Sequence, residues 1–222
     1  MNIFDIMGPV MVGPSSSHTA GAVRIGRLTR AILGSQPTDA HILLHGSFSA
    51  TGKGHGTDRA LVAGLLGMAP DDPRLPQSLA LADQAGMSVS FESADLPNAH
   101  PNTAQLSVTD AAGRSIAVTA SSLGGGRVRV NAIDGLEVSF SGDLPTLIIR
   151  NQDRPGIVAE VSNLLSRHGV NIATMQLRRD NRGGLAVLIL ESDQPLPPGV
   201  LQELTRQDGI VSSIYLNPEG GV

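Results

Sequence analysis

The spacing of apolar residues changes near residue 87. Before this point apolar positions recur every three to four residues, which is typical of helices, and after it they tend to alternate with polar ones, as in strands. We expect helices at 19–33, 57–68 and 75–85, a strand at 40–44, and further strands at 88–92, 104–109, 115–120 and 127–131. This order predicts an α+β domain with an antiparallel series of strands.

A short turn-like break at 141–145 separates a second pattern. Strands are expected at 146–150, 171–178, 185–191 and 210–216, with helices at 156–168 and 198–206. The order βαββαβ is that of the ferredoxin-like fold. We therefore expect an α+β protein with domains at 1–143 and 146–217 and a tail at 218–222.

Composition narrows the classes of function. The net charge is −4 and aromatic residues make up only 2% of the chain, without a basic block, which argues against nucleic-acid binding. No apolar run approaches the ~20 residues of a membrane helix, and the first residues lack a secretory pattern. We expect no membrane partner and a cytoplasmic location. The chain has no cysteine, so it cannot by itself supply a thiolate-held cluster.

Two polar segments surround histidines with small hydroxyl residues and glycines, and both are predicted to be loops. Glycine lets the backbone approach a ligand closely, and histidine can move protons near neutral pH. The two segments therefore indicate a small-molecule site. The first segment contains Ser15, Ser16, Ser17, His18 and Thr19, and the second contains His45, Ser47, Thr51, Lys53 and His55.

Two other interpretations of the second segment are weaker. A phosphate-binding P-loop needs four residues between its glycines and Ser or Thr after Lys, whereas five residues separate Gly46 from Gly52 and Gly54 follows Lys53. A zinc site could use His41 and His45, but they lie on a strand with no intervening glutamate. We assign no metal site to this chain.

The segments Asn151–Gly156 and Gly169–Ile172 resemble those of ACT domains. The resemblance implies side-by-side self-association and an amino-acid effector bound by Asn151, Asp153 and Asn171. A helix N-terminus would favour the effector's carboxylate. Asp153 could instead cap the helix, and Asn171 could only complete a turn; both alternatives stay open.

Three motifs carry a resemblance over essentially the whole chain: Gly-Pro-Ser-Ser-Ser-His-Thr, His-Gly-Ser-Phe-Ser-Ala-Thr-Gly-Lys-Gly-His-Gly-Thr-Asp, and His-Pro-Asn-Thr at 100–103. With an ACT module behind them, they resemble the β subunit of iron–sulfur-dependent L-serine dehydratases, also called L-serine ammonia-lyases. The first domain also resembles the allosteric substrate-binding domain of some phosphoglycerate dehydrogenases.

This resemblance implies conversion of L-serine to pyruvate and ammonia, a reaction of amino-acid degradation and gluconeogenesis. It implies a 4Fe–4S cluster held by cysteines of a partner α subunit, without which this chain would be inactive. The absence of cysteine from this chain fits a cluster held by the α subunit. In this family the cluster would act as a Lewis acid on serine.

The resemblance also implies roles for the candidate residues. His45 would be the base that removes the α-proton, with Ser47 and Thr51 beside it in the pocket. His18 and the serines at 15–17 would bind the carboxylate or polarise a hydroxyl. The other substrate-contacting candidates are Thr19, Lys53, His55, His100 and Asn102.

A different class of function stays open. The chain could be a non-catalytic regulatory subunit that senses an amino acid, with catalysis wholly in another chain. The serines at 15–17 could be only a helix cap. His55 could only hydrogen-bond its own segment, and His41 and His168 are expected to be scaffold residues.

Overall fold

The computed structural model describes residues 10–218, which divide into two compact units. The first unit runs to Ser141 and the second begins at Gly142, except that Leu136–Val138 group with the second. Of the predicted tail, only Pro218 lies within the described residues. No helix in the described range is long and apolar enough to cross a membrane.

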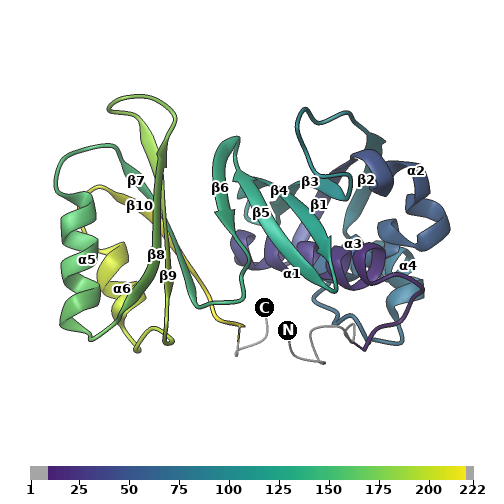
Figure 1. Cartoon of the computed structure of the whole chain (residues 1–222), viewed down its shortest axis with the longest axis horizontal. Helices are drawn as coiled ribbons and strands as arrows, with labels where there is room; N and C mark the ends of the chain where they lie inside the picture. The colour runs from purple at the N-terminus through teal and green to yellow at the C-terminus, as the bar shows by residue number, and fades with distance from the viewer. Residues whose placement is uncertain (1–9, 219–222) are drawn as a thin grey trace. The chain divides into compact units, whose positions relative to one another are not determined.

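The first unit places helices on a six-stranded sheet (Figure 1). Its helices are η2 (Ser16–Gly21, a π-helix), α1 (Ala22–Leu33), α2 (Gly46–His55), α3 (Thr57–Leu65), η3 (Leu75–Gln77, a 3-10 helix) and α4 (Ser78–Gln84). The strands of the sheet are β1 (Pro37–Leu44), β2 (Ser88–Ser93), β3 (Thr103–Asp110), β4 (Ser115–Gly124), β5 (Arg127–Ile133) and β6 (Leu136–Phe140), of which β6 belongs only in part to the first unit.

The strand order of this sheet is β2-β1-β3-β4-β5-β6. β1 pairs in parallel with β2 and antiparallel with β3, and the β3–β4 and β4–β5 pairs are antiparallel. The antiparallel series that the sequence predicts is therefore present from β3 to β5, whereas β2, expected to belong to it, pairs in parallel with β1. The parallel edge strand β2 ends beside the carboxyl end of β1, where α2 begins.

Helices α1 and α3 cross with their backbones in contact at two glycines. A Cβ atom on Gly26 would lie 2.2 Å from the Leu61 carbonyl oxygen, and one on Gly64 would lie 2.1 Å from the Val23 carbonyl oxygen. Neither position has room for a side chain. This close crossing holds α1, and hence the π-helix η2 that leads into it, against the unit's core.

The prediction of loops around the histidines is wrong. Residues 16–21 form η2, which Ser15 caps by accepting a hydrogen bond from the His18 amide, and residues 46–55 form α2. The sequence hides α2 because three of its ten residues are glycine and only Phe48 is a large apolar residue. Contacts from elsewhere in the fold hold it: Phe48 is completely buried.

The α2 N-terminus is capped by a distant carbonyl group. The Pro101 oxygen accepts hydrogen bonds from the Ser47 amide at 2.8 Å and the Phe48 amide at 3.4 Å. A Cβ on Gly46 would lie 2.7 Å from that oxygen, and Gly46 has a φ of +55°. The position therefore needs glycine both because there is no room for a side chain and because the backbone has a positive φ. Two of the orphan amides of this helix start, those of Ser47 and Phe48, are thus satisfied by protein.

The second unit confirms the βαββαβ order. Its elements are β7 (Thr146–Gln152), α5 (Ile157–Arg167), β8 (Ile172–Arg179), β9 (Leu185–Ser192), α6 (Val200–Thr205) and β10 (Ile210–Leu216). The sheet order is β10-β7-β9-β8, with every neighbouring pair antiparallel. Both helices lie on the same face of this sheet (Figure 1), over a core of Leu, Ile and Val.

Candidate functional site

His18 joins the first polar segment to the second. Its Nε2 atom lies 3.2 Å from the Ser47 hydroxyl and 3.1 Å from the Thr51 hydroxyl. Ser47 and Thr51 lie one turn apart in α2, so they present their side chains on the same helix face. The His18 side chain is buried. The structure therefore brings together three of the four residues expected to be catalytic.

The hydrogen bonds around His18 select one tautomer. The Thr51 hydroxyl donates its hydrogen to the Ser47 carbonyl oxygen at 2.8 Å, so it accepts from the ring. The neutral ring then carries its hydrogen on Nε2, and Nδ1 accepts from the Ser15 hydroxyl, 3.3 Å away. His18 thus acts as a hydrogen-bond donor toward α2.

Two more rings pack against His18. The ring centroids of His18 and Phe48 are 5.3 Å apart, and those of His18 and His55 are 5.1 Å apart. Burial lowers the pKa of the His18 imidazole, and the neighbouring charge of His55 lowers it further. The neutral ring is therefore the favoured form.

His45 lies at the junction of β1 and α2 and is held by the connector between β2 and β3, residues 94–102. Its backbone amide donates to the Thr103 carbonyl at 3.0 Å. Its ring atom Nδ1 accepts a hydrogen bond from the Leu96 amide at 3.1 Å and lies 3.5 Å from the Asp95 carboxylate. The side chain is 15% exposed, so it is still reachable from solvent.

The same connector contains the third motif. His100 accepts a hydrogen bond at Nδ1 from the Asn102 amide, and its carbonyl accepts one from the Thr103 hydroxyl at 2.6 Å. Thr103 in turn accepts from Ser121, and Ser121 from the Asn131 amide group, at 2.7 and 2.6 Å. This buried chain of polar groups fixes the connector to β4 and β5.

The remaining residues of the first segment face other parts of the same unit. The Ser16 hydroxyl accepts from the Gly125 amide at 3.3 Å, at the turn between β4 and β5. Ser17 lies next to Gly124. The Thr19 side chain is buried against Gly13, and its hydroxyl has no hydrogen-bond partner among the described residues. The Lys53 side chain lies outside the described part of the structure.

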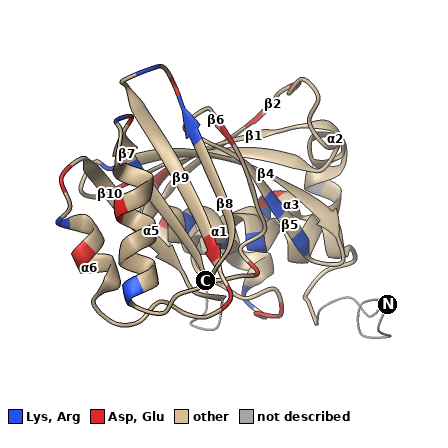
Figure 2. Ribbon diagram, turned by 60° about the vertical axis from the view of Figure 1, so that its left-hand side comes forward, with Lys and Arg blue, Asp and Glu red and all other residues tan. Residues whose placement is uncertain are grey.

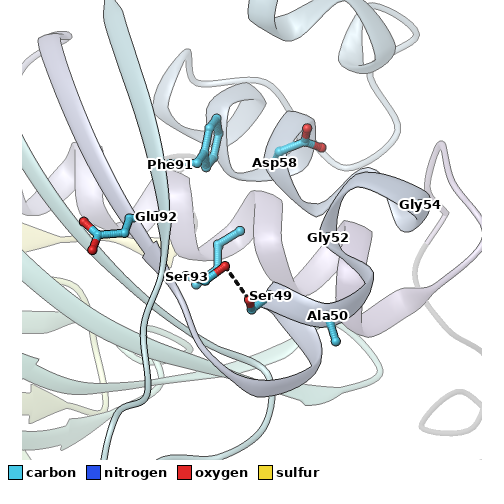
Figure 3. Close-up of a pocket in the computed structure, with 9 residues that line it drawn as sticks. Ser49, Ala50, Gly52, Gly54, Asp58, Phe91, Glu92 and Ser93 are labelled. Carbon is cyan, nitrogen blue, oxygen red and sulfur yellow. Dashed lines mark hydrogen bonds between the residues drawn. The ribbon is translucent and has the colours of Figure 1, made fainter.

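A cavity of about 330 Å³ lies along α2 (Figure 3), and sequence reasoning did not single out the residues around it. The Ser49 hydroxyl donates to the Ser93 hydroxyl at 2.7 Å, and both residues line the cavity. The lining residues are Leu44, Ser49, Ala50, Gly52, Gly54, Asp58, Phe91, Glu92 and Ser93. One sequence signal does point here: Ser49, Gly52, Gly54 and Asp58 belong to the second histidine motif.

In the second unit, the three predicted effector residues are not brought to one cavity. Asn171 lines a cavity of about 410 Å³ together with Ser162, Ser166, Gly169, Val170 and Ile172. Its amide group donates to the Asp193 carboxylate. Asn151 is buried in β7 and donates to the Gln152 carbonyl.

Asp153 is engaged with the β8–β9 turn rather than with that cavity. It accepts hydrogen bonds from the Gly183 amide and the Arg179 guanidinium, both at 2.9 Å. These contacts, the amide first, lower the pKa of the Asp153 carboxyl. Figure 2 shows the basic end of β8, where Arg179 lies, in blue.

Two family models match this chain. Residues 2–85 match the family described as "Serine dehydratase beta chain", and residues 145–209 match the ACT domain. The chain is 38% identical over 210 residues to "Probable L-serine dehydratase, beta chain" of Bacillus subtilis (strain 168), covering 95% of each. This chain belongs to the L-serine dehydratase beta-chain family. The resemblance inferred from the three motifs is confirmed.

Two other relatives complete the comparison. "L-serine dehydratase, beta chain" of Peptoniphilus asaccharolyticus is 40% identical over 214 residues, which cover 96% of each chain. "D-3-phosphoglycerate dehydrogenase" of Archaeoglobus fulgidus is 35% identical over 94 residues, which cover 41% of this chain and 18% of the relative. The family relationship therefore rests on full-length similarity to beta chains.

Proposed function

We propose that this chain is the β subunit of an L-serine ammonia-lyase, which with an α subunit converts L-serine to pyruvate and ammonia. The observation that carries the proposal is full-length similarity to two serine dehydratase beta chains, each covered to at least 95%. The grouping of His18, Ser47 and Thr51, with His45 at the start of the same helix, supports a substrate-contacting role.

The proposed cofactor is a 4Fe–4S cluster that the α subunit holds. This chain's own residues do not fit such a group: the sequence has no cysteine, and the described residues contain no group of three His, Asp or Glu that could hold a metal. We therefore assign this chain the handling of substrate and protons only.

The reaction is an α,β-elimination. The α-proton leaves, its electron pair forms the Cα–Cβ double bond, and hydroxide departs from Cβ. The resulting aminoacrylate tautomerises and hydrolyses to pyruvate and ammonia. We assign α-proton removal to His45, since a positioned imidazole contributes roughly 10²–10⁴-fold to such a step.

The other candidates contact the substrate in this proposal. His18 donates through Nε2–H to Ser47 and Thr51 and so fixes the face of α2 that meets serine. The connector carrying His100 and Asn102 closes over the helix start. Ser15, Ser16, Ser17, Thr19, Lys53 and His55 complete the polar surroundings.

In the second unit we propose an amino-acid effector in the cavity at Asn171, and association of ACT domains between copies. The cavity lies where α5 ends and β8 begins, and it combines hydroxyl groups, an amide group and apolar surface. Polar groups of this kind can orient an amino acid.

The test is reconstitution. This chain is mixed anaerobically with the cluster-bearing α chain from the same source, and pyruvate formation from L-serine is followed. Activity only in the mixture is expected, and His45→Ala should remove turnover while the complex still assembles with its cluster. His41→Gln is the matched control, because His41 lies on β1 and contacts Ser90 instead.

The rival proposal, a regulatory subunit that only senses an amino acid, predicts a different result. Full activity of the α chain alone would contradict a shared active site. Retained turnover in His45→Ala with an altered response to effector would place catalysis wholly in the α chain.

A further inference from the structure

The Nδ1 atom of His45 has two neighbours with opposite requirements. The Leu96 amide, 3.1 Å away, donates a hydrogen bond and therefore needs a lone pair on Nδ1. The Asp95 carboxylate, 3.5 Å away, accepts and therefore needs a hydrogen on the same atom. The ring can satisfy only one of them at a time.

The backbone fixes Asp95 at this position. The Ala94 amide donates to the Leu44 carbonyl at 3.0 Å, and the Leu96 amide donates to the His45 ring. Asp95 stands between these two attachments, at the point where the chain leaves β2 and passes the start of α2. The course of the chain therefore places the Asp95 backbone beside His45, and the side chain, which is 96% exposed, brings its carboxylate to 3.5 Å from Nδ1.

The contact with Leu96 sets the resting state of His45. With Nδ1 accepting from an amide, the neutral ring carries its hydrogen on Nε2 and can only donate from that atom. A base needs the opposite tautomer, with the hydrogen on Nδ1 and a lone pair on Nε2. In that tautomer Asp95 is the acceptor for the Nδ1 hydrogen.

We propose that Asp95 is the positioning residue that makes His45 competent as the base. This rests on the proposed function. When Nδ1 exchanges the Leu96 amide for the Asp95 carboxylate, Nε2 takes the α-proton of serine, and the C–H electron pair forms the double bond as hydroxide leaves Cβ. The imidazolium that results donates from Nδ1 to Asp95, whose negative charge balances it.

Two other histidines of the site, His18 and His100, lack this arrangement. Nδ1 of His18 faces the Ser15 hydroxyl, and Nδ1 of His100 accepts from the Asn102 amide. Among the site histidines in the described range, only His45 lies within ion-pair distance of a carboxylate. All three rings rest with Nδ1 as an acceptor, and the nearby carboxylate of Asp95 distinguishes His45 from His18 and His100.

The kinetic test uses the reconstituted complex. Asp95→Asn keeps the size of the side chain but removes the charge, and it should lower kcat by at least about tenfold, since orienting carboxylates act on the tautomer and on the imidazolium. KM should change less than about twofold, and Asp95→Glu should recover part of kcat. Asp83→Asn, an exposed aspartate on α4, is the matched control and should leave both constants unchanged.

A spectroscopic test uses the chain alone, with ¹⁵N-labelled histidine. In acid, where the ring is protonated, the Nδ1 signal of His45 should move in Asp95→Asn relative to the unmodified protein, while the His41 signals should not. An unchanged Nδ1 signal, or an unchanged kcat, would overturn the proposal. If the unmodified complex does not consume serine at all, the proposed function fails, and the labelled-histidine experiment still tests the contact.

Discussion

The Thr51 hydroxyl lies 3.1 Å from Nε2 of His18 and donates its own hydrogen to the Ser47 carbonyl, so the histidine is the donor between them. The two residues are 33 positions apart. This hydrogen bond joins the π-helix η2 to α2, and it makes a buried histidine part of the framework on which the site is built.

Replacing His18 by alanine should therefore cost stability. The change removes the hydrogen bonds from His18 to the Ser47 and Thr51 hydroxyls and leaves a buried space, while Thr51 keeps its bond to the Ser47 carbonyl; such losses typically amount to about 1–3 kcal/mol. Urea unfolding of the whole chain measures the free energy of unfolding of each variant. His41→Ala, at a partly exposed position on β1, should stay within about 0.5 kcal/mol. Equal effects of the two changes would argue against a framework role for His18.

Stability should also depend on pH through His18. Because burial and His55 lower its pKa below the usual 6.5, the unfolded chain binds the proton more readily than the folded one. The contribution of His18 is complete above 6.5 and is lost as the pH falls toward the folded-state pKa. Urea midpoints from about pH 7.5 to 5 should fall less steeply in His18→Gln than in the unmodified protein. Parallel curves would contradict the lowered pKa.

The crossing of α1 and α3 should not tolerate a methyl group. Gly64→Ala places a Cβ 2.1 Å from the Val23 oxygen, so the helices must separate, at a cost of about 1–3 kcal/mol. Gly54→Ala is the matched change in α2: a Cβ there meets nothing within 4 Å, and alanine favours a helix by about 0.5–1 kcal/mol. Thermal unfolding should give a lower melting temperature for Gly64→Ala and a higher one for Gly54→Ala. An unchanged melting temperature in Gly64→Ala would show that the helix crossing can relax.

We expect L-serine to raise the melting temperature by binding in the cavity at Asn171. A ligand at 100 times its Kd adds about 2.7 kcal/mol to stability. Asn171→Ala should lose that part of the shift. Asp153→Asn should keep it, because Asp153 is engaged with Arg179 and Gly183 instead. The opposite ranking of the two variants would move the effector site to the β8–β9 turn.

The architecture was largely predictable from the sequence, because the strands from β3 to β5 and the whole βαββαβ unit have regular spacing of apolar residues. α2 was not predictable in this way. Its glycines and hydroxyl residues give little helical preference, and the groups that stabilise it, Pro101 and His18, come from distant segments. No strand was expected at β6, a short element of five residues.

The candidate site was predicted in composition but not in arrangement. The motifs located His18, His45 and His100, yet residue types alone do not reveal which ring nitrogen accepts a hydrogen bond. That property depends on backbone amides such as those of Leu96 and Asn102, which every residue except proline supplies equally. Asp95 lies outside all three motifs and became a candidate only through its distance from His45.

The cap that Pro101 supplies to α2 has a consequence for how the protein is made. During synthesis, α2 emerges long before the connector that satisfies its first amides. A helix with so little intrinsic preference should remain unformed until β3 has paired with β1 and carried Pro101 into place, because the entropy of closing that long loop must be met first. The site would then become ordered only after β1 and β3 have paired, although most of its residues are synthesised before β3.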